Sequence, residues 1–209
     1  MQNTRTAAVL LAAGCSSRFG SNNKLLEPVN DIPILQHSLQ AIFDSALQQC
    51  ILVTGHEAAD IEAVAENHPI SIVHNPDYRL GISGSIKVGI QAVHEDIDAA
   101  VIVLGDMPGI DRHIIDTLVS AFNPGQGHEI CVPTFRGRRG NPVLWGRRLF
   151  SDLCMLEGDI GGRQLIGQYK EAVKECECFN EAVHIDIDTI TDLIDRKPVS
   201  IPQEISDES

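Results

Sequence analysis

The sequence predicts one α/β domain with a doubly wound, mostly parallel sheet of the Rossmann-like kind, and three observations support this. Short apolar runs typical of strands alternate with helix-like segments through the first 125 residues, as β-α-β units require. The runs at 6–12 and 98–104 are apolar almost throughout, which suits strands covered on both faces. With 209 residues, 43% of them hydrophobic and 22% charged, the chain can bury one full core.

The first half reads as a regular series of strands and helices. One helix carries Leu35, Leu39 and Ile42 on a single face, and we expect Asp31 to cap it, with Pro33 just inside its start. A later helix should be capped by Asp111. The expected order is strand 6–12, loop 14–24, helix 33–46, strand 50–54, helix 58–66, strand 70–74, helix 82–93, strand 98–104 and helix 111–122.

The second half is less regular. Its expected order is strand 130–133, a basic turn at 136–140, strand 142–145, helices 147–155 and 163–169, strands 173–178 and 183–187, and a helix at 189–196. The polar, acidic end at 198–209 is expected to fray. Because no repeat or linker separates the halves, we predict a single domain over 1–197, divided into a half over 1–125 and a half over 126–197.

The charge balance limits the partners of the protein. Lys and Arg number 16 against 29 Asp and Glu, for a net charge of −13, which disfavours sequence-independent binding of nucleic acid. No apolar run approaches the roughly 20 residues of a membrane-spanning helix, so we expect no membrane partner either. Five arginines form either a solvated turn or, as we favour, a contact for an anionic substrate: Arg136, Arg138, Arg139, Arg147 and Arg148.

The N-terminus allows two interpretations. Residues 1–14 imitate a lipoprotein signal that ends before Cys15, but the apolar stretch is short and Ala12 stands where such signals usually carry a larger aliphatic residue. We therefore favour a buried strand followed by a glycine loop. The six cysteines show no disulfide framework and no complete set of zinc ligands, which predicts reduced thiols in a cytoplasmic protein.

The glycine-rich loop after the first strand predicts a phosphate site. Glycine and serine in such a loop let backbone N–H groups turn toward phosphate oxygens, and Arg18 and Lys24 add positive charge to an otherwise acidic chain. The loop has neither the spacing of a Walker loop nor that of a dinucleotide fingerprint. Besides these two basic residues, the candidate binding residues here are Leu11, Ala12, Ala13, Gly14, Ser16, Ser17 and Gly20.

Carboxylates follow at two further strand ends. Asp106 comes after the strand at 98–104, and the carboxyl ends of parallel strands are where open α/β sheets place their sites. Asp186 and Asp188 should share one face at the end of the strand at 183–187. Such oxygen ligands suit Mg²⁺, although each carboxylate could also cap a helix or turn. Asp159 is a weaker candidate, expected to cap a helix that begins near residue 161.

A set of motifs occurs in order along nearly the whole chain. They are L-A-A-G-C-S-S-R-F-G at 11–20 with Lys24, G-I-S-G-S-I-K-V-G at 81–89, G-D-M-P at 105–108, R-G-R-R-G-N-P-V-L-W at 136–145, L-F-S-D-L at 149–153, E-G-D-I-G-G-R at 157–163 and H-I-D-I-D-T at 184–189. This set resembles the nucleotidyltransferases with a GT-A-like α/β fold, and within them the molybdenum cofactor cytidylyltransferases. Two positions depart from the usual family pattern, with Asn141 in place of a histidine and Gly84 in place of a serine.

The resemblance implies transfer of CMP from CTP to the phosphate of molybdopterin-bound molybdenum, with Mg²⁺ or Mn²⁺ held by Asp106 and by Asp186 or Asp188. Arg18 and Lys24 would act with Asp106 in catalysis. The half over 1–125 would bind the nucleotide and the half over 126–197 the acceptor. The product would pass to a molybdenum hydroxylase of the xanthine dehydrogenase type or to its maturation chaperone. Further substrate contacts are expected from Gly81, Ser83, Ser85, Asn141 and Arg163.

Three alternatives stay open from the sequence. The acceptor could be an isoprenoid or sugar phosphate. A non-catalytic carrier could deliver the finished cofactor, although a carrier has no need of Lys24, Asp106 and Asp186. An NAD(P)-dependent oxidoreductase is disfavoured because the dinucleotide fingerprint is absent. Related guanylyltransferases resemble L-A-G-G where this chain has L-A-A-G at 11–14, and the extra methyl group of Ala13 favours CTP over the larger GTP.

Overall fold

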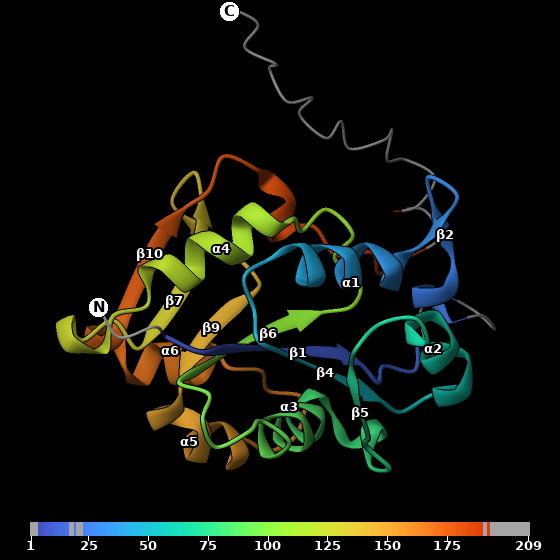
Figure 1. Ribbon diagram of the computed structural model, residues 1–209, viewed down its shortest axis with the longest axis horizontal. Coiled ribbons are helices and arrows are strands. Elements are labelled where there is room, and N and C mark those ends of the chain that lie inside the picture. Colours follow the sequence, from blue (N-terminus) through green and yellow to red (C-terminus); the bar gives the residue numbers. More distant parts are fainter. Residues whose placement is uncertain (1–3, 17–18, 20–22, 190–191, 193–209) are drawn as a thin grey trace, which may run out of the picture.

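An eight-stranded mixed sheet forms the centre of the computed structural model, which describes residues 4–16, 19, 23–189 and 192 (Figure 1). Its strands are β1 (Thr6–Ala12), β4 (Gln49–Thr54), β5 (Ser71–His74), β6 (Ala99–Leu104), β7 (Ile130–Phe135), β8 (Arg138–Arg139), β9 (Val143–Gly146) and β10 (Val173–Glu177). They follow the order β10-β7-β9-β6-β1-β4-β5, with β8 paired to β7. The pairs β1–β4, β1–β6, β4–β5 and β7–β10 are parallel. Because β9 pairs antiparallel with β6 and β7, both halves of the chain share one sheet.

Helices cover both faces of this sheet (Figure 1). They are α1 (Ile34–Asp44), α2 (Ala58–Ala65), α3 (Ile82–Gln91), α4 (Arg112–Ala121), α5 (Phe150–Cys154) and α6 (Arg163–Gln168). Short 3₁₀ turns are η1 (Lys24–Leu26), η2 (Tyr78–Leu80), η3 (Pro124–Gln126), η4 (Arg147–Leu149), η5 (Lys170–Ala172) and η6 (Glu181–His184). Helices α1, α2 and α4 pack on one face, and α3, α5 and α6 on the other. The predicted fold class is confirmed.

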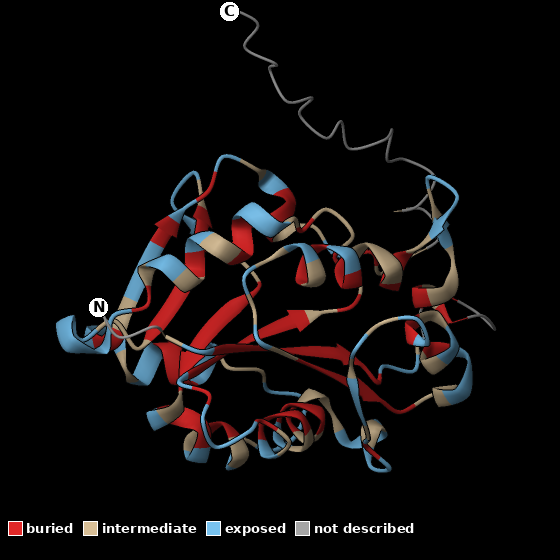
Figure 2. Ribbon diagram, viewed as in Figure 1, coloured by how far each residue is buried: buried red, intermediate tan, exposed pale blue. Residues whose placement is uncertain are grey.

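The central strand β1 shows why its sequence is apolar throughout. Ala8 and Leu10 belong to the core under α1 and α4, whereas Val9 and Leu11 belong to the core over α3, because successive side chains of a strand alternate between faces. All seven residues of β1 are buried, and Figure 2 shows the same burial along the neighbouring strands. In the described part of the chain, no helix is both long and apolar enough to cross a membrane.

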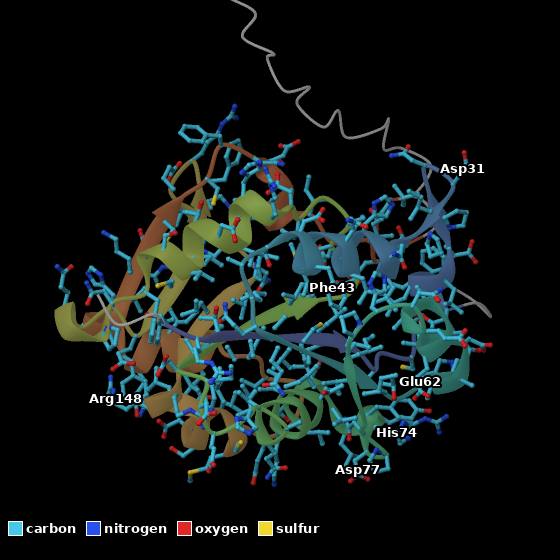
Figure 3. All side chains as sticks on the ribbon, in the orientation of Figure 1. Asp31, Phe43, Glu62, His74, Asp77 and Arg148 are labelled. Atoms are coloured by element: carbon cyan, nitrogen blue, oxygen red, sulfur yellow. The ribbon has the colours of Figure 1, made fainter. Side chains whose placement is uncertain are left out.

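The expected cap of the first helix is wrong. Asp31 lies with Asn30 at the tip of a small hairpin between β2 (Pro28–Val29) and β3 (Ile32–Pro33), and both turn residues have left-handed backbone, with φ of +65° and +52°. Figure 3 shows Asp31 on the outside of the molecule. Helix α1 begins directly after Pro33 without a side-chain cap. Asn and Asp tolerate left-handed backbone better than most residues, so Asn30 and Asp31 form a turn and Asp31 does not cap the helix. The cap predicted at Asp111 is confirmed.

The expected strand at 183–187 is also absent. Residues Glu181–His184 form η6, and the chain then runs without regular structure to residue 188. Val183 and Ile187 are each 1% exposed, so the alternating pattern reflects a segment that packs over the end of the sheet. Most of the expected helix at 189–196 and all of the tail at 198–209 lie outside the described residues.

Candidate active site

A cleft of about 510 Å³ opens where β1 and β6 end. The two strands are parallel neighbours, so the loops that follow them meet at the same edge of the sheet. The cleft is lined by residues of the loop after β1, by Lys24, by residues of the segment 78–85, and by the carboxylates of Asp106, Asp159 and Asp188. The fold thus collects polar and charged groups at the place where an α/β sheet binds its ligands.

Two short-range hydrogen bonds set the position of Lys24. Ser16 has left-handed backbone, with φ of +47°, and its Oγ accepts a hydrogen bond of 3.1 Å from the backbone N–H of Lys24. The side chain of Asn23, which is 2% exposed, caps η1 by accepting a hydrogen bond of 3.1 Å from the N–H of Leu25. These contacts place Lys24 at the start of η1, beside the cleft.

The predicted residues of this loop have different positions. Leu11, Ala13, Gly14 and Ser16 line the cleft. Ala12 is 1% exposed and packs into the core on the opposite face, because it is out of phase with Leu11 and Ala13 in the strand alternation. The loop residues that lie outside the described residues are Ser17, Arg18 and Gly20.

The ammonium group of Lys24 lies between two carboxylates. Its Nζ is 2.7 Å from Oδ2 of Asp106 and 3.0 Å from Oδ1 of Asp188. Only 14% of the Lys24 side chain is exposed. Burial by itself would lower the pKa of Lys24, but the two carboxylates more than offset burial and raise that pKa above its ordinary value. Lys24 is therefore charged at neutral pH and is a counterion of the acidic cluster.

The acidic cluster has the donor set of a divalent-cation site. Asp106, Asp186 and Asp188 each offer one oxygen, and these oxygens lie within 4.8 Å of one another. The other oxygen of Asp106, Oδ1, is buried and has no hydrogen-bond partner among the described residues. A buried carboxylate oxygen without a partner is costly, and carboxylate oxygens are the ligands that Mg²⁺ and Mn²⁺ prefer. The residues present therefore fit a divalent cation.

Packing around Ile187 brings Asp186 and Asp188 to this cluster. The N–H of Ile187 donates a hydrogen bond of 2.9 Å to the carbonyl oxygen of Asp106. The N–H groups of Asp188 and Thr189 donate to Oδ2 of Asp192 at 3.0 and 2.7 Å. The expectation that both carboxylates would be held on one face of a strand is wrong in its mechanism, since hydrogen bonds and core packing hold the segment.

The segment 78–85 forms a second wall of the cleft. Gly81 has a φ of +114° and, like Ser85, lines the cleft. Ser83 and Ser85 lie in the first turn of α3, where a serine could cap the helix, but neither does. Instead, the hydroxyl of Ser83 donates to the carbonyl oxygen of Gly158 at 2.7 Å, and the hydroxyl of Ser85 accepts from Nδ2 of Asn75 at 3.0 Å. Partners far along the chain have displaced the local capping role.

The arginines at 136–148 do not line the described cleft, and their contact with an anionic substrate stays a prediction. Arg139 pairs with Glu175 at 2.7 Å and Arg148 with Glu129 at 3.1 Å. Figure 3 shows Arg148 at the end of the molecule opposite Asp31. The guanidinium of Arg147 donates to the carbonyl oxygens of residues 94 and 97. In this structure they mostly tie neighbouring segments together.

Asn141 and Arg163 also lie away from the lining of the described cleft. Asn141 precedes a cis peptide bond to Pro142, and its N–H donates to the carbonyl oxygen of Val183 at 2.8 Å. Arg163 is exposed at the start of α6. Their contact with a substrate stays a prediction. Sequence reasoning gave no role to Asn75 and Tyr78, although Asn75 directly follows the end of β5 and could have been found by the rule that singled out Asp106.

The site combines a Rossmann-like sheet, a glycine loop after the first strand and a lysine held by carboxylates at the strand ends, an arrangement suited to an enzyme that acts on nucleotide phosphates. Residues 8–173 match the MobA-like NTP transferase domain. The chain belongs to this family and is an enzyme of the nucleotidyltransferase class.

Relatives with different names match most of the chain, one of them a nucleotidyltransferase and another an oxidoreductase. The chain is 31% identical over 195 residues to the molybdenum cofactor cytidylyltransferase of Escherichia coli K12, covering 90% of this chain and 94% of that protein. It is 26% identical over 187 residues to the nicotine blue oxidoreductase of Paenarthrobacter nicotinovorans, covering 87% and 91%. Crystal structures of Rv0371c from Mycobacterium tuberculosis, one of them a complex with manganese, superpose with TM-scores of 0.80 and 0.77 at 28% and 27% identity. Each superposition covers 91% of this chain, and it covers 96% of the first Rv0371c chain and 97% of the chain in the manganese complex.

Proposed function

We propose that this enzyme transfers CMP from CTP to the terminal phosphate of molybdopterin-bound molybdenum, giving molybdopterin cytosine dinucleotide and pyrophosphate. The observation that carries nucleotidyl transfer is the cluster of Lys24, Asp106 and Asp188 at the edge of a cleft lined by the loop after β1. The choice of CTP and of this acceptor is supported by the Escherichia coli relative. Ala13, which lines the cleft, supports the choice of CTP over GTP.

The reaction depends on the positioning of the two substrates more than on a general base. A phosphate monoester has a second pKa of about 6, so the acceptor oxygen is anionic at neutral pH. The described lining of the cleft contains no histidine, in keeping with this requirement. The acceptor oxygen attacks the α-phosphorus of CTP, a new P–O bond forms, and the bond to the β-phosphate breaks in line, so that pyrophosphate leaves with the electron pair.

The residues of the site divide this work. The backbone of the loop after β1 lies against the triphosphate, and Lys24 offsets the charge that develops on the departing pyrophosphate. Asp106, with Asp186 or Asp188, would hold Mg²⁺ or Mn²⁺. When bound, such an ion neutralises phosphate oxygens and orients them. Arg18 stays a predicted partner of the phosphates. The product would then pass to a molybdenum hydroxylase or its maturation chaperone.

The mass of the product tests the proposal. The purified protein is incubated with Mg²⁺, molybdopterin-bound molybdenum and, in turn, CTP, GTP, ATP or UTP, with Asp106→Asn as the control. We expect the cytosine dinucleotide and pyrophosphate from CTP. Product with an isoprenoid or sugar phosphate but none with molybdopterin would identify a different acceptor. Tight binding of the finished cofactor without any turnover would indicate a carrier, and a change in NAD(P)H absorbance would indicate an oxidoreductase.

A further inference from the structure

Helix α3 begins without a cap from its own sequence. Its N-cap position is Gly81, which has no side chain, and neither Ser83 nor Ser85 turns back to the first turn. The first N–H groups of a helix have no partner inside the helix and need one from elsewhere. In α3 these groups lie at the wall of the cleft, so their partner matters for the shape of the site.

A loop of the second half supplies that partner. Oδ1 of Asp159 accepts a hydrogen bond of 3.4 Å from the N–H of Ile82. The carbonyl oxygen of Gly158 accepts two more, 3.3 Å from the N–H of Ser83 and 2.7 Å from its hydroxyl. We call residues 157–161 the strap. It lies across the start of α3 and joins positions 77 residues apart in the chain.

The contact between strap and helix is backbone against backbone. A Cβ built on Gly81 would lie 2.4 Å from the backbone of Gly158 and 2.6 Å from the backbone N of Asp159. Such approaches are shorter than real Cβ contacts, and the φ of +114° at Gly81 is also unfavourable for other residues. A glycine at position 81 therefore lets the strap come close enough to bond the helix.

The other end of this wall is held by the first half. A Cβ on Gly55 would lie 2.8 Å from the Cβ atoms of both Ala13 and Tyr78, so Tyr78 and Ala13 both pack closely against Gly55, which follows β4. Between these two anchors, the wall presents Tyr78, Leu80 and Ile82 to the cleft. Leu80 is 71% exposed and Asp159 is exposed as well, so little core packing restrains the strap end of the wall.

We propose that Asp159 is a positioning residue, which caps α3 from the second half and thereby fixes the wall of the cleft in the shape that binds the nucleotide. A side-chain oxygen at a helix N-terminus accepts from N–H groups that have no partner inside the helix. The proposal rests on the proposed function only in requiring that a nucleotide enters the cleft. It does not depend on the choice of CTP or of the acceptor.

Three variants separate capping from charge and from folding. Asp159→Ala removes the cap, Asp159→Asn removes the charge but keeps an oxygen that accepts the N–H of Ile82, and Glu157→Ala removes an equal charge from an exposed position of the same strap. Two quantities are measured on each full-length variant. One is the hydrogen exchange rate of the Ile82 and Ser83 amides by NMR, and the other is the dissociation constant of Mg²⁺–CTP with the turnover at saturation.

Loss of an N-cap corresponds to about a fivefold change in an equilibrium constant. In Asp159→Ala we therefore expect Ile82 to exchange about fivefold faster and CTP to bind about fivefold more weakly, with turnover at saturation changed by less than twofold. For Asp159→Asn and Glu157→Ala, the exchange rate at Ile82, the dissociation constant of Mg²⁺–CTP and the turnover at saturation should each stay within twofold of wild type. If Asp159→Ala does not fold, Asp159→Gly is measured instead, which also removes the carboxylate that accepts from Ile82, and the same changes are expected.

The outcomes against the proposal are distinct. Unchanged exchange at Ile82 in Asp159→Ala would show that Asp159 is not the cap. If Asp159→Asn or Glu157→Ala lost as much amide protection and CTP affinity as Asp159→Ala, the effect would come from charge alone. If wild type binds another nucleoside triphosphate more tightly than CTP, that nucleotide becomes the probe. The proposed function then fails, whereas the exchange rates still decide the role of Asp159.

Discussion

The two halves of the chain contribute to the cleft in different ways. The first half provides the loop after β1, Lys24, Asp106 and the segment 78–85, most of which follow the ends of parallel strands. Among the described residues, the second half lines the cleft only with Asp159 and Asp188, both acidic and both held by long-range hydrogen bonds. Topology therefore builds the phosphate side of the site, and contacts between distant segments complete it.

The largest expected effect tests the first half at its strand end. Asp106→Asn should leave the protein folded, because the change is nearly isosteric, and should lower turnover by about 100-fold or more, the scale of losing a major charge-stabilising group. Turnover is measured at saturating nucleotide and Mg²⁺, with thermal unfolding as the folding control. If the turnover of Asp106→Asn stayed within threefold of wild type, Asp106 would not be part of the catalytic site.

The second half is tested by a matched pair of variants. Asp188→Asn should lower turnover by about 30-fold, because this carboxylate is only 35% exposed and contacts Lys24. Asp186→Asn should lower turnover by only a few-fold, since Asp186 is exposed and exposed charges are well screened. Turnover and the Mn²⁺ dissociation constant are measured side by side. The reverse order would make Asp186 the second ligand of the cation.

Lys24 forms ion pairs with a carboxylate of each half. Its removal should change the affinities for metal and for nucleotide in opposite directions. A positive charge about 3 Å from the ligand oxygens repels a bare cation by at least about 1 kcal/mol. Lys24→Met should therefore bind Mn²⁺ about tenfold more tightly without nucleotide, while it binds the nucleotide at least several-fold more weakly. Electron paramagnetic resonance titration of free Mn²⁺ gives the first value, and fluorescence or calorimetry the second. Weaker Mn²⁺ binding by Lys24→Met would show that Lys24 is not a competitor of the cation.

The smallest expected effect concerns the choice of base. The methyl group of Ala13 lies in the confined space beside Gly55 and Tyr78, and a few extra atoms in a tight pocket are worth about 1–3 kcal/mol. Wild type should prefer CTP over GTP by at least about tenfold in kcat/KM. Ala13→Gly should narrow the preference several-fold without reversing it, because other contacts to the base remain. Equal use of both nucleotides by wild type would contradict the cytidylyl assignment but not the enzyme class.

Sequence was sufficient for the features that follow from hydrophobic pattern, from parallel strand order or from a partner close in the chain. The apolar run of β1, the loop that follows it and Asp106 at the end of β6 were all expected, because burial on both faces and the parallel strand order require them. The cap at Asp111 was also expected, since its partner, the N–H of Ile114, is three residues away. In these places the pattern of the sequence itself reveals the structure.

Only the tertiary structure decided the remaining features. The hydroxyls of Ser83 and Ser85 bonded Gly158 and Asn75, and the segment around Ile187 packed over the sheet without joining it. Asp159 caps a helix 77 residues before it rather than the next one. A polar side chain takes whichever partner the folded chain brings within about 3 Å, and sequence spacing does not reveal that partner when it comes from another part of the fold.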